Sequence, residues 1–265
     1  VDGYPLQLTV SFEARRTDYP TWREAPCADF YRDWAQSQFG PRAAARAAEI
    51  FSRLDGDLPR PSTWVDGPGG LGPDPRPRQQ IAQDYAFVDA LAELEPYVQS
   101  PGYQERFHYW LANFRYLAMV GKLNGTWAEL NQKLDEMQQA ASNTDKAEIA
   151  RRSVLPYRRR LIRELTYVQN YLLNSVTTLG GMGTIANWQQ HVIPMLLRPS
   201  EEALSEVLGN ELPAHARLPR EYSADTRIFV PVVRSLLEPA EPLQLKVIVL
   251  GARPITAGCY WRPLG

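Results

Sequence analysis

The chain has 265 residues, a formal net charge of −1 and a sequence pI of about 6.4. Hydrophobic residues make up 44% of it, which is enough to build a sizeable core and excludes a wholly disordered protein. The near neutrality argues against a nucleic-acid partner, because such proteins normally carry a basic excess. No apolar run is long enough to predict a membrane-spanning helix.

The first predicted element is a strand near the N-terminus. Apolar Leu6, Leu8, Val10 and Phe12 alternate with polar residues, which is the period-2 pattern of a half-buried strand. The chain begins with Val instead of an initiator Met. We therefore expect residues 1–25 to be a strand and linker that belong to an upstream domain.

Helical periodicity begins after Pro26 and predicts a helical bundle over residues 26–210. Gly40 is expected to end the first helix, and Pro41 to open the second, where its missing N–H costs nothing. A Pro/Gly-rich loop is expected over residues 57–78. The further predicted helices cover residues 79–94, 103–122, 126–141, 144–173, 185–197 and 199–209. Thr126 and Glu129 form a capping box, and Pro156 is expected to interrupt the helix that contains it. Gly180–Gly183 is expected to be a helix C-cap and tight turn.

The pattern returns to strands near the C-terminus, at residues 228–230, 243–250 and 259–261. The predicted fold class is mainly α: a multi-helix bundle with an N-terminal strand and a short C-terminal antiparallel β segment over residues 225–265. A sheet of two or three strands with open edges is marginal by itself. We therefore expect further strands to follow, or these strands to pair with the N-terminal one.

The sequence contains no recognisable cofactor or metal motif. The three His residues are far apart, the two Cys residues lack zinc spacing, and Gly180–Gly183 lacks the Lys of a phosphate-binding loop. No cofactor and no metal site are therefore expected, and the sequence points to no catalytic residue. It also leaves open whether Cys27 and Cys259 form a disulfide.

Aromatic and amide-rich segments are the best candidates for a binding site. Sugars are bound by stacking on Trp or Tyr and by hydrogen bonds between their hydroxyls and the side chains of Asn, Gln, Asp, Glu, Arg and His. Trp and Tyr on a helix also serve as core anchors with one satisfied polar tip, and this alternative stays open. The carbohydrate-binding candidates are Glu13, Arg15, Trp64, Asp66, Tyr109, Asn113, Tyr116, Asn187, Trp188 and His191.

One segment resembles a known enzyme family. The residues Asp33–Gly40 (DWAQSQFG), preceded by Phe30-Tyr31 and followed by an Ala-rich helix, resemble the helical region that follows the catalytic barrel in large bacterial glycoside hydrolases. Family 115, the α-glucuronidases, is the nearest of these. The resemblance implies the order strand, helix bundle, β-sandwich, with the catalytic carboxylates upstream. It therefore transfers no catalytic residue.

These observations lead to one main hypothesis and two alternatives. The chain is expected to be a non-catalytic helical support and substrate-cleft domain of a secreted or periplasmic glycoside hydrolase that degrades polysaccharides. Its expected partners are an oligosaccharide or polysaccharide and the remaining domains of the parent protein. One alternative is a stand-alone helical binding or interaction module. The other is a complete hydrolase, which would require two carboxylates about 5–10 Å apart in one pocket.

Overall fold

The computed structural model describes residues 27–62, 70–209, 212–219, 222–223, 226–230 and 238–251, together with 256 and 258. The strands predicted at residues 6–14 and 259–261 and the question of a Cys27–Cys259 disulfide lie outside these residues. The chain divides into two compact units, which are described separately. Unit 1 comprises Val1–Arg60 and Ala82–Phe114, and unit 2 comprises Pro61–Ile81 and Arg115–Gly265.

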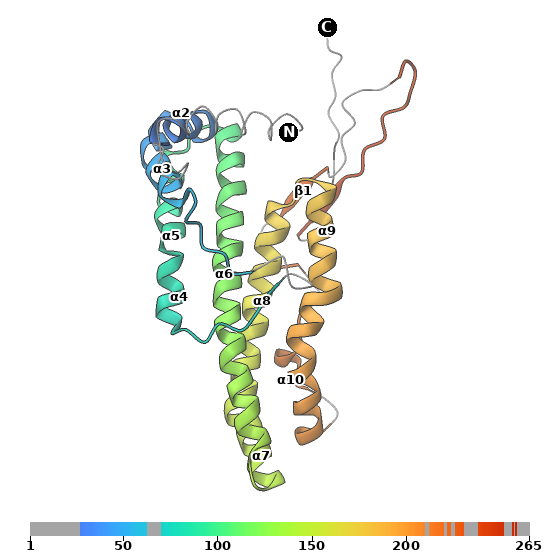
Figure 1. Ribbon diagram of the computed structural model, residues 1–265. Helices are drawn as coiled ribbons and strands as arrows, with labels where there is room; N and C mark the ends of the chain where they lie inside the picture. The colour runs from blue at the N-terminus through green and yellow to red at the C-terminus, as the bar shows by residue number, and fades with distance from the viewer. Residues whose placement is uncertain are drawn as a thin grey trace. The chain divides into compact units, whose positions relative to one another are not determined.

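Unit 1 is built from short helices and the first part of one long helix (Figure 1). Three described α-helices, a short 3-10 helix and the first part of the long helix contribute to it, and the chain passes between the two units within a further helix, α4. Their bounds are α2 (Ala28–Phe39), α3 (Pro41–Leu54), α4 (Arg78–Asp84), α5 (Ala86–Ala92), the 3-10 helix Glu95–Tyr97 and α6 (Pro101–Gln138).

The corner between α2 and α3 confirms the predicted helix end and helix start. Gly40 adopts a φ of 83° and donates its N–H to the Gln36 carbonyl, and Pro41 is the first residue of α3. The Arg106 side chain supports this corner, because its Nε donates to the Gln38 carbonyl at 3.1 Å. A Cβ at position 40 would lie 2.9 Å from the Tyr103 ring.

Replacing Gly40 with alanine should therefore destabilise unit 1. A positive φ costs an L-residue about 1–2 kcal/mol, and the added methyl group would also collide with Tyr103. Urea unfolding followed by circular dichroism measures the effect. The control is Gly102→Ala in the first turn of α6, where the nearest atom is 3.7 Å away and no positive φ is required. Equal stability of the two variants would contradict the prediction.

The core of unit 1 is an aromatic cluster. The Phe39 ring contacts the Phe107 ring at a centroid distance of 5.7 Å, and the Phe51 ring contacts the Trp34 ring at 4.6 Å. Trp34 also lies 5.6 Å from the Trp110 ring of α6. Thus Trp34 and Phe39 of the segment that carries the family resemblance pack against the other helices of this unit.

Two helix predictions in this region are wrong. The helix predicted over residues 79–94 is broken at Tyr85 into α4 and α5. The separate helices predicted over residues 103–122 and 126–141 are one continuous 38-residue helix, α6. Thr126 is therefore no N-cap, but a fully buried residue in the middle of α6.

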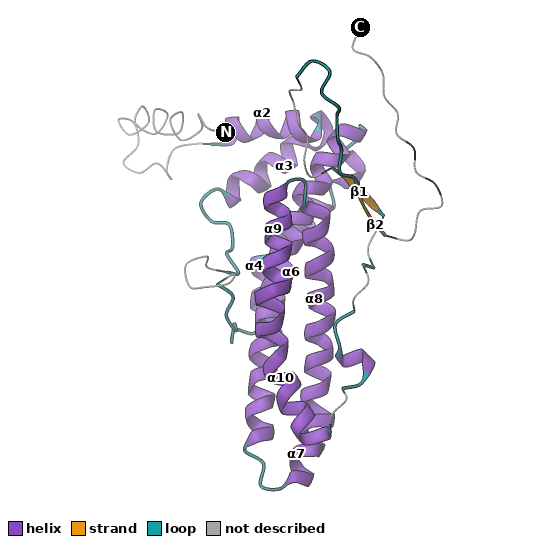
Figure 2. Cartoon of the chain, turned by 90° about the vertical axis from the view of Figure 1, so that its right-hand side faces the viewer, coloured by secondary structure: helices purple, strands orange, loops and turns teal. Residues whose placement is uncertain are grey.

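Unit 2 contains the C-terminal part of α6 and two long helical runs alongside it (Figures 1 and 2). The first run is α7 (Asn143–Ile149), a π-helical turn (Ala150–Val154) and α8 (Leu155–Ser175). The second is α9 (Leu179–Asn187), a π-helical turn (Trp188–Val192) and α10 (Ile193–Leu208). A 3-10 helix (Ala214–Ala216) follows α10.

The two π-helical turns accommodate proline. Each turn ends two residues before a proline, Pro156 in α8 and Pro194 in α10. A proline within a helix lacks an N–H and its ring clashes with the carbonyl four residues earlier, and a wider turn relieves that clash. The interruption predicted at Pro156 is therefore a wide turn within a continuous helical run.

The helix boundary predicted at Pro199 is wrong, because α10 continues through that residue. The helix end predicted at Gly209 is confirmed, because Gly209 is the C-cap of α10. The tight turn predicted at Gly180–Gly183 is also wrong. These glycines lie in α9, whose N-terminus is capped by the Thr178 hydroxyl through the Gly181 N–H at 3.3 Å. Ser142 caps α7 in the same way, two residues before the predicted Thr144.

The core of unit 2 is a continuous aliphatic cluster that joins α6, α8 and α10. Leu123 and Leu130 of α6, Leu161 and Leu165 of α8 and Leu196 of α10 are almost fully buried in it. The cluster extends to Ala216 in the last 3-10 helix. This packing fixes the helices that carry the polar residues of the candidate site.

A two-stranded antiparallel sheet follows the helices. It consists of β1 (Arg227–Phe229) and β2 (Ile248–Leu250), in which Ile228 pairs with Val249. The predicted antiparallel β segment is thus confirmed in its described part. Ile248 and Leu250 are partly buried, whereas other large apolar residues in the described part of this segment are exposed: Ile228, Leu243, Leu245, Val247 and Val249.

Candidate functional site

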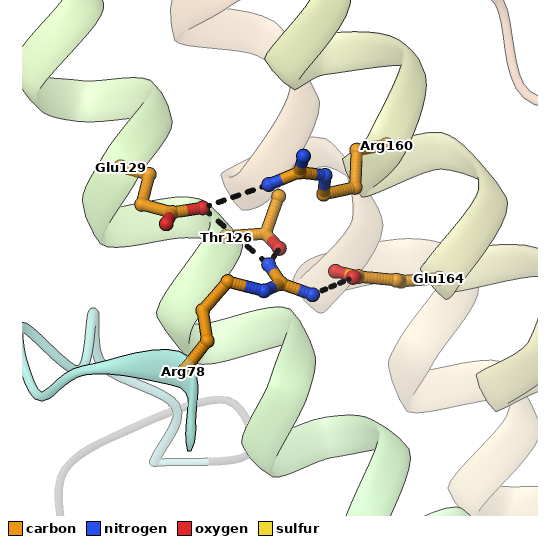
Figure 3. A network of polar contacts seen from close by, with 5 residues as sticks. All are labelled: Arg78, Thr126, Glu129, Arg160 and Glu164. Atoms are coloured by element: carbon orange, nitrogen blue, oxygen red, sulfur yellow. Dashed lines mark hydrogen bonds and ion pairs between the residues drawn. The ribbon is translucent and has the colours of Figure 1, made fainter. Parts of the chain in front are cut away.

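A cluster of charged side chains around Arg78 joins three segments of unit 2 (Figure 3). The Arg78 guanidinium donates from Nη1 to the Thr126 hydroxyl at 2.5 Å and to Glu129 Oε2 at 3.4 Å. Its Nη2 donates to Glu164 Oε1 at 2.9 Å. Arg160 completes this Arg78 network by donating to Glu129 Oε2 at 3.2 Å. The network therefore connects the start of α4 to both α6 and α8.

The network pairs two guanidinium groups with two carboxylates, and it is partly buried. Glu164 is only 6% exposed, and one of its oxygens, Oε2, has no hydrogen-bond partner in the described part of the chain. Burial lowers the pKa of Arg78, but the hydrogen bond and charge of Glu164, with those of Glu129, outweigh burial and raise it overall. Arg78 thus stays cationic and compensates the buried Glu164 carboxylate.

The same part of α6 also binds the Pro-rich loop through Asn124. The Asn124 side-chain amide donates to the Pro61 carbonyl at 2.6 Å, and the Asp74 backbone N–H donates to the Asn124 carbonyl at 3.0 Å. Arg76 binds both carboxylate oxygens of Asp74, and this hydrogen bonding lowers the pKa of Asp74. Two points of the loop, Pro61 and Asp74, are therefore bonded to Asn124 of α6.

A second arginine, Arg158, is almost fully buried between α8, α10 and the last 3-10 helix. Its Nε donates to the Ala216 carbonyl at 2.9 Å, and its Nη1 donates to the Leu197 carbonyl at 2.7 Å and to the Ser200 hydroxyl. Its Nη2 pairs with Glu201 at 3.2 Å. Burial lowers the pKa of Arg158, and the Glu201 charge opposes that effect. The guanidinium thus joins three elements through two backbone carbonyls, the Ser200 hydroxyl and the Glu201 carboxylate.

Two of the predicted sugar-binding residues contact each other inside unit 2. The Trp188 indole N–H donates to the Tyr116 hydroxyl at 2.9 Å, and Trp188 is only 3% exposed. Burial raises the pKa of the Tyr116 phenol, although the bond from Trp188 opposes that shift. The polar tip of each ring is thus satisfied by the other, which is how core anchors behave.

None of the remaining candidates that the structure describes forms a side-chain hydrogen bond or a ring contact with this pair. Asn187 and His191 flank Trp188 in the sequence, and His191 is exposed. Tyr109 is 38% exposed in unit 1, and the Asn113 amide donates to the Tyr109 carbonyl at 2.7 Å. The other candidates, Glu13, Arg15, Trp64 and Asp66, lie outside the described residues.

Removing the indole N–H should weaken unit 2 modestly. In the variant Trp188→Phe the buried Tyr116 hydroxyl loses its donor, which costs about 1 kcal/mol in addition to the smaller ring. Adding Tyr116→Phe should recover part of that loss, because both polar groups are then absent. Urea unfolding of the two single variants and the double variant tests this, and strictly additive losses would contradict it.

Metal sites, membrane spans and surface depressions are further kinds of functional feature. Among the described residues, no group of three or more His, Cys, Asp or Glu side chains could hold a metal ion. None of the described helices is long and apolar enough to cross a membrane. A surface depression beside α7 and its π-turn is lined by Asn143, Thr144, Ala147, Glu148, Arg151 and Arg152.

Comparison with known proteins adds no functional assignment. No family model matches the sequence, and neither the curated proteins nor the solved structures give a match. The function of this chain must therefore be inferred from its sequence, its fold and its polar networks.

The sequence pattern did not single out Arg78 and Glu164 as partners. Arg78 follows a Pro-rich loop, Glu164 lies in an Arg-rich helix, and 86 positions separate them. A usable signal was present in Thr126 and Glu129, whose spacing is typical of a helix cap. Thr126 and Glu129 share one face of α6, and both bind Arg78.

Proposed function

We propose that this chain is a non-catalytic helical support domain of a glycoside hydrolase that acts on polysaccharides outside the cytoplasm. The link to carbohydrate processing rests on the resemblance of Asp33–Gly40 to the helical region of such enzymes. The support role rests on how the charged residues of unit 2 are used. Arg78 and Arg158 each bind groups from several elements, so they hold a rigid scaffold together.

The observation that carries the proposal is the exposed apolar face of the C-terminal β segment. Leu243, Leu245, Val247 and Val249 are exposed at alternate positions, a spacing that places side chains on one side wherever a chain is extended, and Ile228 lies opposite Val249. Exposed apolar patches mark surfaces that associate with a partner. A β layer of a neighbouring domain in the parent protein is the partner that we propose for this face.

Hydrogen exchange tests the proposal on the polypeptide that the complete gene encodes. We expect the amides of residues 243–250 to exchange much more slowly in that polypeptide than in the 265-residue chain, because a neighbouring domain covers the apolar face. We also expect it to hydrolyse a polysaccharide. Unchanged exchange, or a gene that encodes no further domain, would overturn the proposal.

The alternative of a stand-alone helical binding module is favoured by one observation. Tyr116 and Trp188, which were candidates for stacking on a sugar, contact each other instead, with Trp188 buried and Tyr116 partly buried. A module without an enzymatic partner should bind its ligand equally well as the 265-residue chain and as the complete gene product. Titration of both proteins with the same oligosaccharide separates the two functions.

A further inference from the structure

The outward side of α8 carries a basic and aromatic stripe. Arg159, Arg163, Tyr167 and Tyr171 recur at every fourth position, so neighbouring members lie on one side of the helix about 6 Å apart along its axis. Both arginines are exposed, and Tyr167 is 45% exposed. We call these four residues the α8 stripe.

The arginines of α8 fall into two groups. Arg158 and Arg160 are occupied by contacts with neighbouring elements. Arg159 and Arg163 make no ion pair or hydrogen bond with any residue that the structure describes. The single acidic residue of α8, Glu164, is buried and bound to Arg78. The stripe thus carries uncompensated positive charge, although the whole chain has a net charge of −1.

The aromatic half of the stripe provides a stacking surface beside this charge. The Tyr167 and Tyr171 rings are nearly parallel, with an interplanar angle of 21° and a centroid distance of 6.2 Å. Tyrosine faces stack on the apolar faces of sugar rings, and guanidinium groups bind carboxylates or sulfates through paired N–H donors. The arginine pair and the tyrosine pair follow each other along a stripe that turns by about 40° per member around the helix, a path that an extended chain of repeating units can follow.

We propose that the α8 stripe binds an anionic polysaccharide, with Arg159 and Arg163 on its carboxylate or sulfate groups and Tyr167 and Tyr171 against its sugar rings. This inference rests on the proposed function and specifies its substrate class. A single-stranded nucleic acid offers similar chemistry, but the net negative charge of the chain disfavours it.

Calorimetric titration of the 265-residue chain tests the stripe with four probes: hexagalacturonate for carboxylates, a sulfated carrageenan oligosaccharide, neutral cellohexaose and an oligothymidylate. We expect binding to an anionic sugar that weakens as salt is added. Arg159→Gln and Arg163→Gln should each raise the Kd about tenfold, because each loses a hydrogen bond to a charged group. Tyr167→Ala should weaken binding as well.

The matched control is Arg198→Gln, which removes an exposed arginine of α10 and should leave the Kd unchanged. The relative affinities for the two anionic sugars identify the preferred charged group. Equal affinity for cellohexaose, tighter stripe-dependent binding of oligothymidylate, or equal effects of Arg163→Gln and Arg198→Gln would each overturn the inference. If the complete gene product hydrolyses polysaccharide but the stripe variants bind as well as the unaltered chain, the stripe inference is wrong and the support role stands. If binding depends on the stripe but the gene encodes no enzyme, the support role is wrong and the stripe inference stands.

Discussion

Replacement of Arg158 by alanine is expected to lower the free energy of unfolding by about 3–5 kcal/mol. The variant removes the side-chain donor of the buried Ala216 carbonyl. The Leu197 carbonyl and the Ser200 hydroxyl each lose one hydrogen bond but still bond to each other, and a cavity opens where the side chain lay. Urea unfolding measures the total loss. Hydrogen exchange should also show faster opening of α10 and of the last 3-10 helix.

Arg159→Ala is the matched control for Arg158, because the neighbouring residue has the same chemistry but points to solvent. It should change stability little, since exposed side chains without partners contribute little. Arg158→Met fills much of the volume without supplying the donors, so its loss should lie between the other two. If Arg158→Ala were as stable as Arg159→Ala, the buried guanidinium would have no structural role.

Arg78→Ala should cost about 2–3 kcal/mol, because it removes the cation that compensates the buried Glu164 carboxylate. Part of the Arg78 side chain is exposed, which keeps the expected loss below that of Arg158. Adding Glu164→Gln to this variant should restore stability in part, because a neutral amide is cheaper to bury than an unpaired charge. Urea unfolding of the two single variants and the double variant forms a double-mutant cycle.

Arg76→Ala serves as the comparison for Arg78. Arg76 lies two residues earlier in the loop, and its bidentate ion pair with Asp74 lies at the surface. Such a pair contributes little to stability. A coupling energy near zero between Arg78 and Glu164, or equal losses for Arg76→Ala and Arg78→Ala, would show that the Arg78 network does not hold the helices together.

Local rules predicted the elements whose ends are set by neighbouring residues. Gly40 and Gly209 end helices because a glycine tolerates the positive φ that terminates them, and Pro41 opens the next helix. The apolar periodicity likewise predicted the helical character of most of the described chain. These features depend on contacts within a few residues, so the sequence alone carries them.

The continuous helix α6 could not be predicted in the same way. Asn124, Gly125 and Thr126 are weak helix formers, and together they indicate a break. Contacts from the distant loop and from α4 stabilise the helix there. Pro61 of the loop binds Asn124, Arg78 of α4 binds Thr126, and Gly125 makes room for Ile81 of α4. Asn124 also begins an Asn-Gly-Thr glycosylation pattern, yet it is only 4% exposed.

The candidate site shows the same limit. Sequence patterns identify Trp188 and Tyr116 as notable, but they cannot show that the two rings bind each other across 72 positions. They also cannot separate Arg158, which is buried, from Arg159, which faces solvent, because the difference depends on how the helix is rotated against its neighbours. That rotation is a property of the packed core.

The two π-helical turns make the helical runs tolerant of small changes in length. A turn of this kind holds one more residue than the α-helical turn that it replaces, while the side chains of the helices on either side keep their rotational position about the helix axis. A variant lacking one residue within either turn can therefore regain ordinary helical winding without reorienting Arg158 or Leu196. The same deletion elsewhere in α8 or α10 rotates every later side chain by about 100° away from its partners.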